Sequence, residues 1–430
     1  MITAIEAIKI KARSQPAYRF QNLYGMLKDE LLYASWQQLN KQSAAGVDGV
    51  KPCDYVADLI PNIKRVSSSL KDKSYRVSAI KRVYIPKADG RQRPLGLPTV
   101  DDKLVQQAAS QILQSIWEAD FLCNSYGYRP NKSAHQATLS LQANLQRGKY
   151  GYIVEADIKG FFDNMDHAWL VRMLEERIDD KAFISLIKQW LKAKVQEPCG
   201  RKVKPKSGTP QGGVISPVLA NIYLHYALDI WFEKVVKPRA KGQAMLIRYA
   251  DDFVVAFQWK DDADAFYGEL GARLNKFGLD VAPEKTRLIR FSRFAVGKER
   301  RFQFLGFEFY WEIDRLRRPR VRQMTSIKKQ KAIMSGLHQW IKQYRSCPLR
   351  ILMPMFRRKL KGIENYFGVL GNSRSLAQIY KHAVNCLWKW LNRRSQRKSY
   401  NWQGMRCMLV FYGVKPLRVS RRYIVLDMYR

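Results

Sequence analysis

The pattern of apolar and polar positions along this 430-residue chain predicts helices and strands in alternation, followed by a wholly helical end. In four segments apolar side chains recur every three or four positions, which is the spacing of an amphipathic helix. These predicted helical segments are residues 1–40, 101–119, 326–345 and 355–400. Asp101 falls at the start of the second segment, where a carboxylate favours the N-terminus of a helix.

Strand-like stretches lie between the predicted helices. RVYIPKADGRQRPLGLP (82–98) has an alternating strand on one side of an Asp-Gly pair and a basic return strand on the other, so it predicts a hairpin. GYIVEADIKGFFDNMD (151–166) predicts a strand that carries an acid and then turns into a helix, and FQFLGFEFY (302–310) is a further strand-like stretch. The expected fold class is therefore α+β with a basic helical tail.

IRYADDFVV (247–255) places two adjacent acids, Asp251 and Asp252, inside an otherwise apolar stretch. The stretch is too short and too apolar for a surface helix, so it predicts two short strands folded about the acids. Upstream of it, residues 207–229 form a Gly- and Pro-rich loop followed by a helical pattern. We expect Ser216 to cap that helix and Pro217 to occupy its first position.

The net charge of +39, from 76 Lys and Arg against 37 Asp and Glu, indicates a polyanionic partner, with nucleic acid as the leading candidate. The charge is uneven, since residues 311–430 hold 28 Lys and Arg against 4 Asp and Glu. The alternative is a basic protein of ribosomal type with a solvated surface. A hydrophobic content of 46% argues against it, because such proteins seldom carry so large an apolar core.

The six cysteines are scattered without a CxxC pair, which gives neither a common zinc pattern nor a disulfide framework and fits a reducing cytosol. No apolar run approaches the ~18 residues that would span a bilayer. The N-terminus also lacks the apolar core and cleavage site of a signal peptide. We therefore expect a cytoplasmic protein with no membrane partner.

Paired carboxylates in a poorly solvated hairpin repel each other, which raises one pKa unless a cation neutralises them. A divalent metal does so, and Mg²⁺ prefers carboxylate oxygens together with substrate phosphates. Asp157, after the apolar Ile153 and Val154, is the best third ligand in the sequence, and such a set suits two-metal phosphoryl transfer. Taken singly, Asp251 and Asp252 fit an ordinary hairpin turn as well as they fit a metal site. Asp157 taken singly fits the cap of the next helix better than a metal site.

Seven stretches in a fixed order then carry a resemblance over residues 40–310. They are RVYIPKADGRQRPLGLPTVDDKLVQQA, SYGYRPNKSAHQA, VEADIKGFFDNMDH, GTPQGGVISPVLANIYLHYALD, IRYADDFVV, GLDVAPEKTRLIRF and FQFLGFEF. The series resembles the ordered blocks of reverse transcriptases, specifically those encoded by group II introns. Two later stretches, KGIENYFGVLGNSRS (361–375) and LWKWLNRRSQRKSYNW (387–402), are similar to the maturase and thumb region of the same family.

The resemblance implies a right-hand polymerase with fingers, a palm built on an antiparallel sheet, and a thumb. Asp157, Asp251 and Asp252 match the catalytic palm carboxylates that hold two Mg²⁺ ions, for which Mn²⁺ could substitute. Four residues match positions that bind the incoming dNTP: Lys87, Arg93, Phe162 and Gln211. Of these, Phe162 matches the position whose ring rejects a 2′-hydroxyl. Each match has an alternative: Lys87 and Arg93 also fit a solvated basic hairpin. Phe162 also fits a core position, and Gln211 an ordinary turn.

The later part of the chain carries candidate nucleic-acid contacts. Leu305 and Gly306 match a primer-supporting turn of the family, although a glycine in a strand also fits a bulge. In the tail we expect nucleic-acid contact from a basic cluster with almost no acids near it, because a solvated face normally mixes both signs. This cluster is Arg393, Arg394, Arg397 and Lys398. The neighbouring Trp388 and Trp390 fit core positions better than stacking surfaces.

Five segments are expected along the chain. They are an N-terminal helical extension (1–40), fingers with part of the palm (41–150), palm (151–320), thumb and maturase domain X (321–395) and a basic DNA-binding segment (396–430). Many members of the resembling family end in a zinc-bearing HNH endonuclease with paired cysteines. Because this chain shows no such pattern, we expect it to lack that domain.

The main hypothesis is an RNA-directed DNA polymerase encoded by a group II intron, which binds the intron RNA to assist splicing and copies it into cDNA during retrohoming. Its expected partners are group II intron RNA, an RNA template with a DNA primer, target DNA and dNTPs. The alternatives are another bacterial reverse transcriptase (retron, CRISPR-associated or diversity-generating), a splicing-only RNA-binding maturase, and an RNA-copying RNA polymerase. The maturase-like tail, the retained acids and Phe162 disfavour these three in turn.

Overall fold

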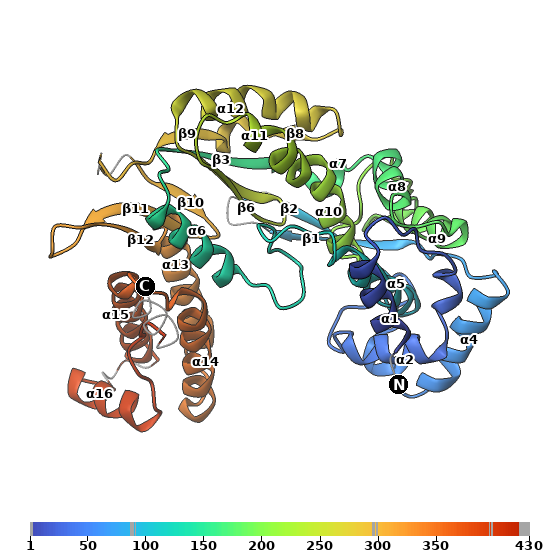
Figure 1. Cartoon of the computed structure of the whole chain (residues 1–430). Helices are drawn as coiled ribbons and strands as arrows, with labels where there is room; N and C mark the ends of the chain where they lie inside the picture. Colours follow the sequence, from blue (N-terminus) through green and yellow to red (C-terminus); the bar gives the residue numbers. More distant parts are fainter. Residues whose placement is uncertain are drawn as a thin grey trace. The chain divides into compact units, whose positions relative to one another are not determined.

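The computed structural model describes residues 3–86, 90, 92–294, 297, 300–394, 396 and 399–420. The chain forms two compact units; Figure 1 colours the chain by residue number, so their segments can be followed in it. The first contains residues 1–137 and 154–288, and the second contains residues 138–153 and 289–430. Both helices and sheets are present and the C-terminal part is largely helical, so the expected α+β class is confirmed. The five finer segments stay a prediction.

The first unit contains many short and medium-length helices. They are α1 (Ala4–Ser14), η1 (Tyr24–Met26), α2 (Asp29–Gln38), α3 (Pro52–Tyr55), α4 (Leu59–Lys71), α5 (Val100–Trp117), α7 (Phe161–Asn164), α8 (His167–Glu175), α9 (Lys181–Leu191), α10 (Ser216–Leu224), the π-helices η2 (His225–Asp229) and η3 (Phe232–Val236), α11 (Lys237–Arg239), α12 (Lys260–Asn275) and η4 (Pro283–Lys285).

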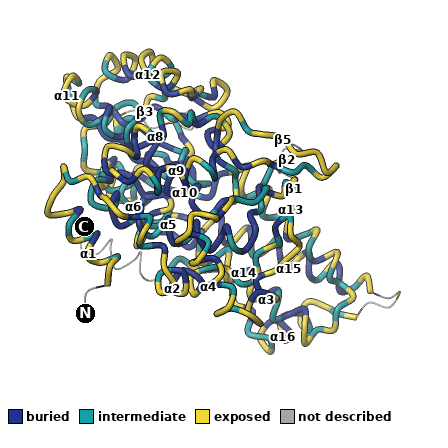
Figure 2. The backbone as a smooth tube through the Cα atoms, turned by 90° about the vertical axis from the view of Figure 1, so that its right-hand side faces the viewer, coloured by how far each residue is buried: buried dark blue, intermediate teal, exposed yellow. Residues whose placement is uncertain are grey.

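Helix α5 is the buried centre of this unit. The Thr99 side chain accepts a hydrogen bond from the Asp102 backbone N–H and so caps the helix, close to the predicted start. Most positions of α5 are buried, Leu104 and Ile112 completely, and only a narrow polar stripe through Gln111 is partly exposed. The buried positions of α5 pack against α1, α2 and α10, and Figure 2 colours such buried backbone dark blue.

Two sheets complete the first unit. The first has the order β2-β1-β4-β5 and consists of β1 (Ile80–Pro86), β2 (Gln92–Leu97), β4 (Val195–Gln196) and β5 (Lys202–Val203). Its antiparallel β1–β2 pair places Pro86 opposite Gln92, which confirms the predicted hairpin. The second has the order β6-β7-β3-β8, with β9 also paired to β3, and consists of β3 (Tyr152–Lys159), β6 (Ala244–Tyr249), β7 (Asp252–Phe257), β8 (Asp280–Val281) and β9 (Arg287–Arg290).

The second unit joins a small sheet to a set of helices. Its elements are most of α6 (Ala134–Arg147), the antiparallel strands β10 (Phe302–Phe304), β11 (Phe307–Ile313) and β12 (Pro319–Thr325), and the helices α13 (Ile327–Tyr344), α14 (Leu349–Phe367), α15 (Ser373–Leu391) and α16 (Trp402–Phe411). The single strand expected over 302–310 is thus two strands, and the helical segment expected over 355–400 is divided between α14 and α15.

Two polar side chains, one partly buried and one fully buried, join the elements of this second unit. Gln146 accepts from the backbone N–H of Val321 at 2.8 Å, which satisfies the edge of β12 with a side chain from α6. Asn372, fully buried before α15, donates to Thr325 and to the Phe367 carbonyl, so one amide joins the sheet to α14 and α15. Within the described part of the chain, no helix could cross a membrane.

Candidate active site

The two adjacent acids lie at the bend of a buried hairpin. Strands β6 and β7 are antiparallel, with Tyr249 opposite Asp252, so Ala250 and Asp251 form the turn between them. Ala250 has a φ of +58°, the left-handed region that a non-glycine residue rarely adopts. The prediction of two short strands folded about the acids is confirmed, and the bend depends on contacts that hold a strained alanine.

Those contacts come from Arg248, whose side chain is completely buried on β6. Its guanidinium forms a bidentate ion pair with Asp229, with N–O distances of 2.8 and 2.6 Å. Its remaining N–H groups donate to the Asn221 side chain, the Ser125 hydroxyl and the Ala250 carbonyl. A buried guanidinium with every N–H bonded is the arrangement that offsets the cost of its desolvation.

The backbone around this cation is equally constrained. The Arg248 N–H donates to Asn124, and the Arg248 carbonyl accepts from Tyr126, so the 124–126 segment extends the pairing of β6. Gly127 follows, and a Cβ at this position would lie 2.3 Å from the Ala250 nitrogen. Only glycine therefore allows this segment to approach the turn so closely. The Gly127 carbonyl accepts from Asn221, which closes the network.

The helix that supplies Asp229 has a local distortion. The five residues His225–Asp229 form a π-helix between α10 and the next helical turn, and π-bulges often mark functional sites. His225 is buried in the same turn, and burial lowers its pKa to about 4, so it is neutral at pH 7. The sequence pattern does not by itself single out Arg248 or Asp229. The available signal was a lone arginine within an apolar strand, which requires a buried acid as its partner.

Asp157 reaches the same region from β3, the strand hydrogen-bonded to β7. Its carboxylate forms a salt bridge with Lys285, and its carbonyl accepts from the backbone N–H of Ala282 at 2.9 Å. The Asp157 side chain remains 26% exposed, in contrast to the completely buried Asp229. The sequence pattern does not single out Lys285 either. This lysine lies in the stretch GLDVAPEKTRLIRF, one of the stretches that carry the family resemblance.

The charges of these residues act on one another. Burial raises the pKa of Asp251 above its usual range, and the negative charge of Asp157 raises it further, whereas Arg93 and Lys285 lower it. Asp157 and Asp251 are thus close enough to repel. Within the described residues, no group of three or more His, Cys, Asp or Glu side chains stands ready to hold a metal ion. The carboxylate oxygens are nevertheless the donor type that hard divalent cations take, and their repulsion is what such a cation would relieve.

Two of the predicted dNTP-binding residues are in direct contact. Arg93 on β2 donates from Nε to the Gln211 side chain at 2.9 Å, and Gln211 donates in turn to Asp163 at 3.2 Å. Lys87 lies outside the described residues. Tyr128, which the sequence analysis did not single out, also faces this group: burial raises its pKa, Asp251 raises it further and Arg93 lowers it.

The two phenylalanines after β3 are both buried, but they have different neighbours. Phe161 is buried against Tyr223, with ring centroids 6.4 Å apart, so it is the structural member. Phe162 is 8% exposed, and its carbonyl accepts from the Thr209 N–H at 2.7 Å. The loop that carries Gln211 therefore lies against the backbone of Phe162.

The predicted cap of α10 was wrong: Ile215 is the cap, while Ser216 lies inside the helix and donates to the Pro210 carbonyl, which shapes this loop.

In the second unit, Leu305 and Gly306 form the tight turn between β10 and β11. Both have positive φ values, +52° and +80°, as a two-residue hairpin turn requires. The turn alternative is thus confirmed over the bulge. The Tyr366 hydroxyl donates to the Leu305 carbonyl at 3.0 Å, and the Ser326 N–H donates to the Gly306 carbonyl, so α14 and the start of α13 hold the turn.

The basic cluster of the tail is only partly described. Arg393 and Arg394 are exposed just after α15, whereas Arg397 and Lys398 lie outside the described residues. Arg394 donates to the Cys347 carbonyl at 2.8 Å, and the Arg393 guanidinium lies over the ring of Trp390. Trp390 is itself buried, which favours the expected core position over a stacking surface.

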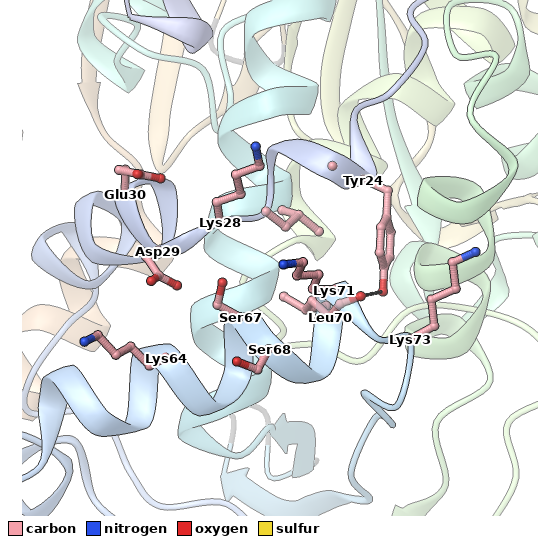
Figure 3. Close-up of a pocket in the computed structure, with 12 residues that line it drawn as sticks. Tyr24, Lys28, Asp29, Glu30, Lys64, Ser67, Ser68, Leu70, Lys71 and Lys73 are labelled. Carbon is pink, nitrogen blue, oxygen red and sulfur yellow. Dashed lines mark hydrogen bonds between the residues drawn. The ribbon is translucent and has the colours of Figure 1, made fainter.

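A separate cavity of about 640 Å³ lies in the N-terminal part of the first unit, between the start of α2 and the face of α4 (Figure 3). It contains none of the predicted site residues. Its lining mixes four lysines with two acids, namely Lys28, Lys64, Lys71, Lys73, Asp29 and Glu30. Because charges of both signs line it, and because the acids occupy the first turn of α2, this cavity does not favour a polyanion.

Comparison with known proteins places these features in a family. The family model for reverse transcriptase (RNA-dependent DNA polymerase) matches residues 85–309, and the model for the group II intron maturase-specific domain matches residues 330–408. The group II intron-encoded protein LtrA of Lactococcus lactis subsp. cremoris is 29% identical, over 86% of this chain and 74% of its own length. Protein YkfC of Escherichia coli (strain K12) is 32% identical, over 57% of this chain and 72% of its own length.

Among solved structures, telomerase from Candida albicans in complex with a fragment of telomeric RNA aligns with a TM-score of 0.44 and 14% identity, over 80% of this chain and 64% of that chain. A likeness at this TM-score supports no inference about the present site. The family models are the stronger result, because the first alone covers more than half of the chain and contains every described residue around Asp251. The chain therefore belongs to the reverse transcriptase family and is an RNA-directed DNA polymerase of the group II intron-encoded, maturase-bearing kind.

Proposed function

We propose that Asp157, Asp251 and Asp252 are the catalytic carboxylates and that together they hold two Mg²⁺ ions, with Mn²⁺ able to replace them. Reverse transcriptases in general depend on divalent metal ions. The observation that carries the proposal is the position of Asp251 in the turn beside Asp157 on β3: burial raises the pKa of Asp251, and the negative charge of Asp157 raises it further. In this structure the ammonium group of Lys285 neutralises the Asp157 carboxylate, so a metal ion would compete with that ion pair.

When bound, such ions supply charge neutralisation at the transferring phosphate and activation of the attacking hydroxyl. The protein's own residues perform the remaining tasks. The Arg248 network fixes the turn that carries Asp251, and therefore the direction in which this carboxylate points. Because that network is fully hydrogen-bonded and buried, the turn is held in place before any substrate binds.

The incoming dNTP is expected between the β2 edge and the loop that carries Gln211. Arg93 offers a guanidinium fork suited to phosphate oxygens, and Gln211 holds that fork through a direct hydrogen bond. Lys87, on the same hairpin in the sequence, would supply a second positive charge. Phe162 lies against the Gln211 loop and would exclude a 2′-hydroxyl, so the polymerase would select deoxynucleotides.

The nucleic-acid partners follow from the two matched families. Intron RNA is the partner implied by the maturase-specific domain, and we propose that the protein assists splicing of that RNA and then copies it into cDNA from a DNA primer at a DNA target. In the second unit, Leu305 and Gly306 would support the primer, and Arg393 and Arg394, with Arg397 and Lys398, would contact nucleic acid. We place this activity in the bacterial cytoplasm, where intron transcripts and nucleoid DNA are both present.

Purification from the host, followed by sequencing of the bound RNA, tests the partner. A structured intron as the dominant RNA is the expected result, and a random set of transcripts would contradict the maturase role.

Extension of a DNA primer on an RNA template tests the enzyme. Incorporation of dNTPs but not rNTPs is expected, and it should require added Mg²⁺ or Mn²⁺. Extension in the presence of excess chelator would remove the metal assignment.

A further inference from the structure

The first unit contains a second cavity, of about 700 Å³, whose charged lining is entirely positive. It is bounded by the segment before β1, the exposed face of α9 and the strands β4 and β5. Its six cationic side chains, which we call the basic cavity residues, are Arg76, Lys188, Lys192, Lys194, Lys202 and Lys204. Ser185 and Gln189 add neutral hydrogen-bonding groups, and no acid contributes to the lining.

Local structure explains why these cations share one surface. On α9 the lining positions Ser185, Lys188, Gln189 and Lys192 are spaced at three and four residues, so they form one stripe along the helix. The opposite stripe, which includes Phe183, Ile187 and Trp190, is buried in the core. Lys202 on β5 and Lys204 directly after this strand flank Val203, and alternate residues of an extended segment project from the same side.

The positive charge of this cavity is uncompensated within the described residues. Neighbouring cations of the same unit have acidic partners, such as Arg82 with Glu197 and Arg65 with Asp101. None of the six basic cavity residues forms an ion pair there. This distinguishes the cavity from that of Figure 3, where Asp29 and Glu30 face the lysines.

A simpler explanation accounts for only part of the cluster. Lys188 and Lys192 lie at the C-terminal end of α9, where cations interact favourably with the helix dipole. That effect does not extend to Lys202 and Lys204 on a different element, nor to Arg76 before β1. Six like charges around one cavity are instead the arrangement that a polyanion stabilises, because binding releases the counterions that otherwise screen them.

The sheet order separates this cavity from the nucleotide site. In the order β2-β1-β4-β5, Arg93 lies on one edge strand and Lys202 on the other. Three strand spacings separate the two edges, which is about 14 Å. None of the cavity residues belongs to the group around Asp157, Asp251 and Gln211. The two edges of one sheet therefore suit two different polyanions.

We propose that the basic cavity is a docking site for the phosphodiester backbone of the folded intron RNA, distinct from the path of the template and primer. The inference rests on the proposed function, because it takes the intron RNA as the polyanion that the protein retains. The cavity holds this RNA through phosphate contacts at the β5 edge, while the β2 edge stays available for the dNTP. Docking by phosphate contacts gives affinity without sequence recognition.

The test compares two variants with the same change in charge. The cavity variant carries Lys188→Gln, Lys192→Gln, Lys202→Gln and Lys204→Gln, all at exposed positions. The control variant carries Lys237→Gln, Lys241→Gln, Lys260→Gln and Lys276→Gln, which are exposed lysines on and beside α11 and α12. Affinity is measured across a range of KCl concentrations with an in vitro transcript of the intron that encodes this chain. Primer extension is measured in parallel on a short unrelated template.

We expect the cavity variant to bind the intron transcript at least roughly tenfold more weakly at physiological salt. Its log K against log[salt] slope should fall by about 3, from the loss of four phosphate contacts. The control variant should change by less than about threefold, and both should extend the unrelated primer at the wild-type rate. Equal weakening of both variants would reduce the effect to net charge and overturn the proposal.

Two further results would also overturn it. A parallel loss of extension on the unrelated template would place the cavity on the template path. Weakened binding of a DNA duplex with unchanged binding of the transcript would assign the cavity to target DNA. The wild-type protein separates these outcomes from failure of the proposed function: if it binds a scrambled RNA of equal length as tightly as the intron transcript, the maturase proposal itself fails.

Discussion

The buried guanidinium of Arg248 donates a hydrogen bond of 3.0 Å to the carbonyl oxygen of Ala250, two residues further along the chain. Ala250 is the left-handed residue of the turn, and Asp251 is attached directly to it. A cation with no solvent exposure thus holds the backbone that presents Asp251, the proposed catalytic acid. Arg248 is in this sense a positioning residue, which acts on the reaction through the turn and not through the substrate.

Replacing Arg248 by Met should therefore impair both folding and catalysis. Asp229 would be left as an unpaired buried carboxylate, which costs about 3–5 kcal/mol in the free energy of unfolding. In the folded fraction, kcat for primer extension should fall while KM for the template–primer stays near the wild-type value. Denaturant unfolding and steady-state kinetics on soluble protein measure the two effects.

The Arg177–Asp120 ion pair provides a matched control, since its N–O distance is 2.6 Å and Arg177 is 5% exposed. It belongs to the same unit but makes no contact with the turn. Arg177→Met should lower stability by a similar amount and leave kcat per folded molecule unchanged. If both variants lowered kcat alike, the specific link between Arg248 and the turn would be lost.

Substitution of Asp157, Asp251 or Asp252 by Asn should each reduce primer extension roughly 1,000-fold or more, because a metal-binding set supplies several kcal/mol at the transition state. The affinity for intron RNA should remain within about twofold. A filter-binding assay beside the extension assay separates the two functions. Near wild-type cDNA synthesis by any of the three variants would exclude that residue from catalysis.

Phe162→Ala should relax discrimination against ribonucleotides. Removing the ring would open the space from which we propose it excludes a 2′-hydroxyl, and steric discrimination of this kind is worth roughly 10–100-fold in kcat/KM. Phe161→Leu is the control, because Phe161 packs against Tyr223 in the core. It should lower stability without changing the choice of sugar. Single-nucleotide incorporation with dNTP and rNTP pairs is the measurement, and an unchanged ratio for Phe162→Ala would place the sugar gate elsewhere.

Arg93→Lys should raise KM for the dNTP by roughly tenfold, since one charge-assisted hydrogen bond is worth about 1.5–3 kcal/mol and Lys lacks the planar fork. Gln211→Ala should have a related effect because it removes the partner that orients Arg93. A double-mutant cycle measures the coupling. If the two effects were simply additive, the contact between Arg93 and Gln211 would have no role in nucleotide binding.

His225 should make the protein less stable in mild acid. Burial lowers its pKa from 6.5 to about 4. Between pH 6.5 and pH 4 the imidazole is therefore protonated in the unfolded chain but neutral in the folded protein. Stability attributable to this group is present above pH 6.5 and is lost as the pH falls toward 4, by roughly 3 kcal/mol in all.

The test variant for this pH effect is His225→Phe, because the imidazole Nδ1 has no hydrogen-bond partner among the described residues and the ring packs edge-on against Phe121. The variant should show a flatter dependence of unfolding free energy on pH between 6.5 and 4. Denaturant unfolding at several pH values provides the comparison. Identical slopes for the wild type and the variant would show that other groups set the acid sensitivity.

Local pattern was sufficient for many elements of this protein. The alternation in β1 and β2, the apolar strands around Asp251 and the strand-to-helix turn after Asp157 follow from rules that act over a few residues, so they could be predicted. The errors were also local. Ser216 lies one residue inside α10, and a left-handed Leu305 divides the strand expected over 302–310.

What the sequence by itself determined was the set of chemical groups and the elements that carry them: the three aspartates, the basic hairpin and the helical basic tail. What only the tertiary structure decided was their neighbours. Arg248 and Asp229 are 19 residues apart, Lys285 and Asp157 are 128 apart, and Gln211 and Arg93 are 118 apart. Such pairs form because a buried charge must find a partner wherever the folded chain brings one, and no local pattern encodes that partner.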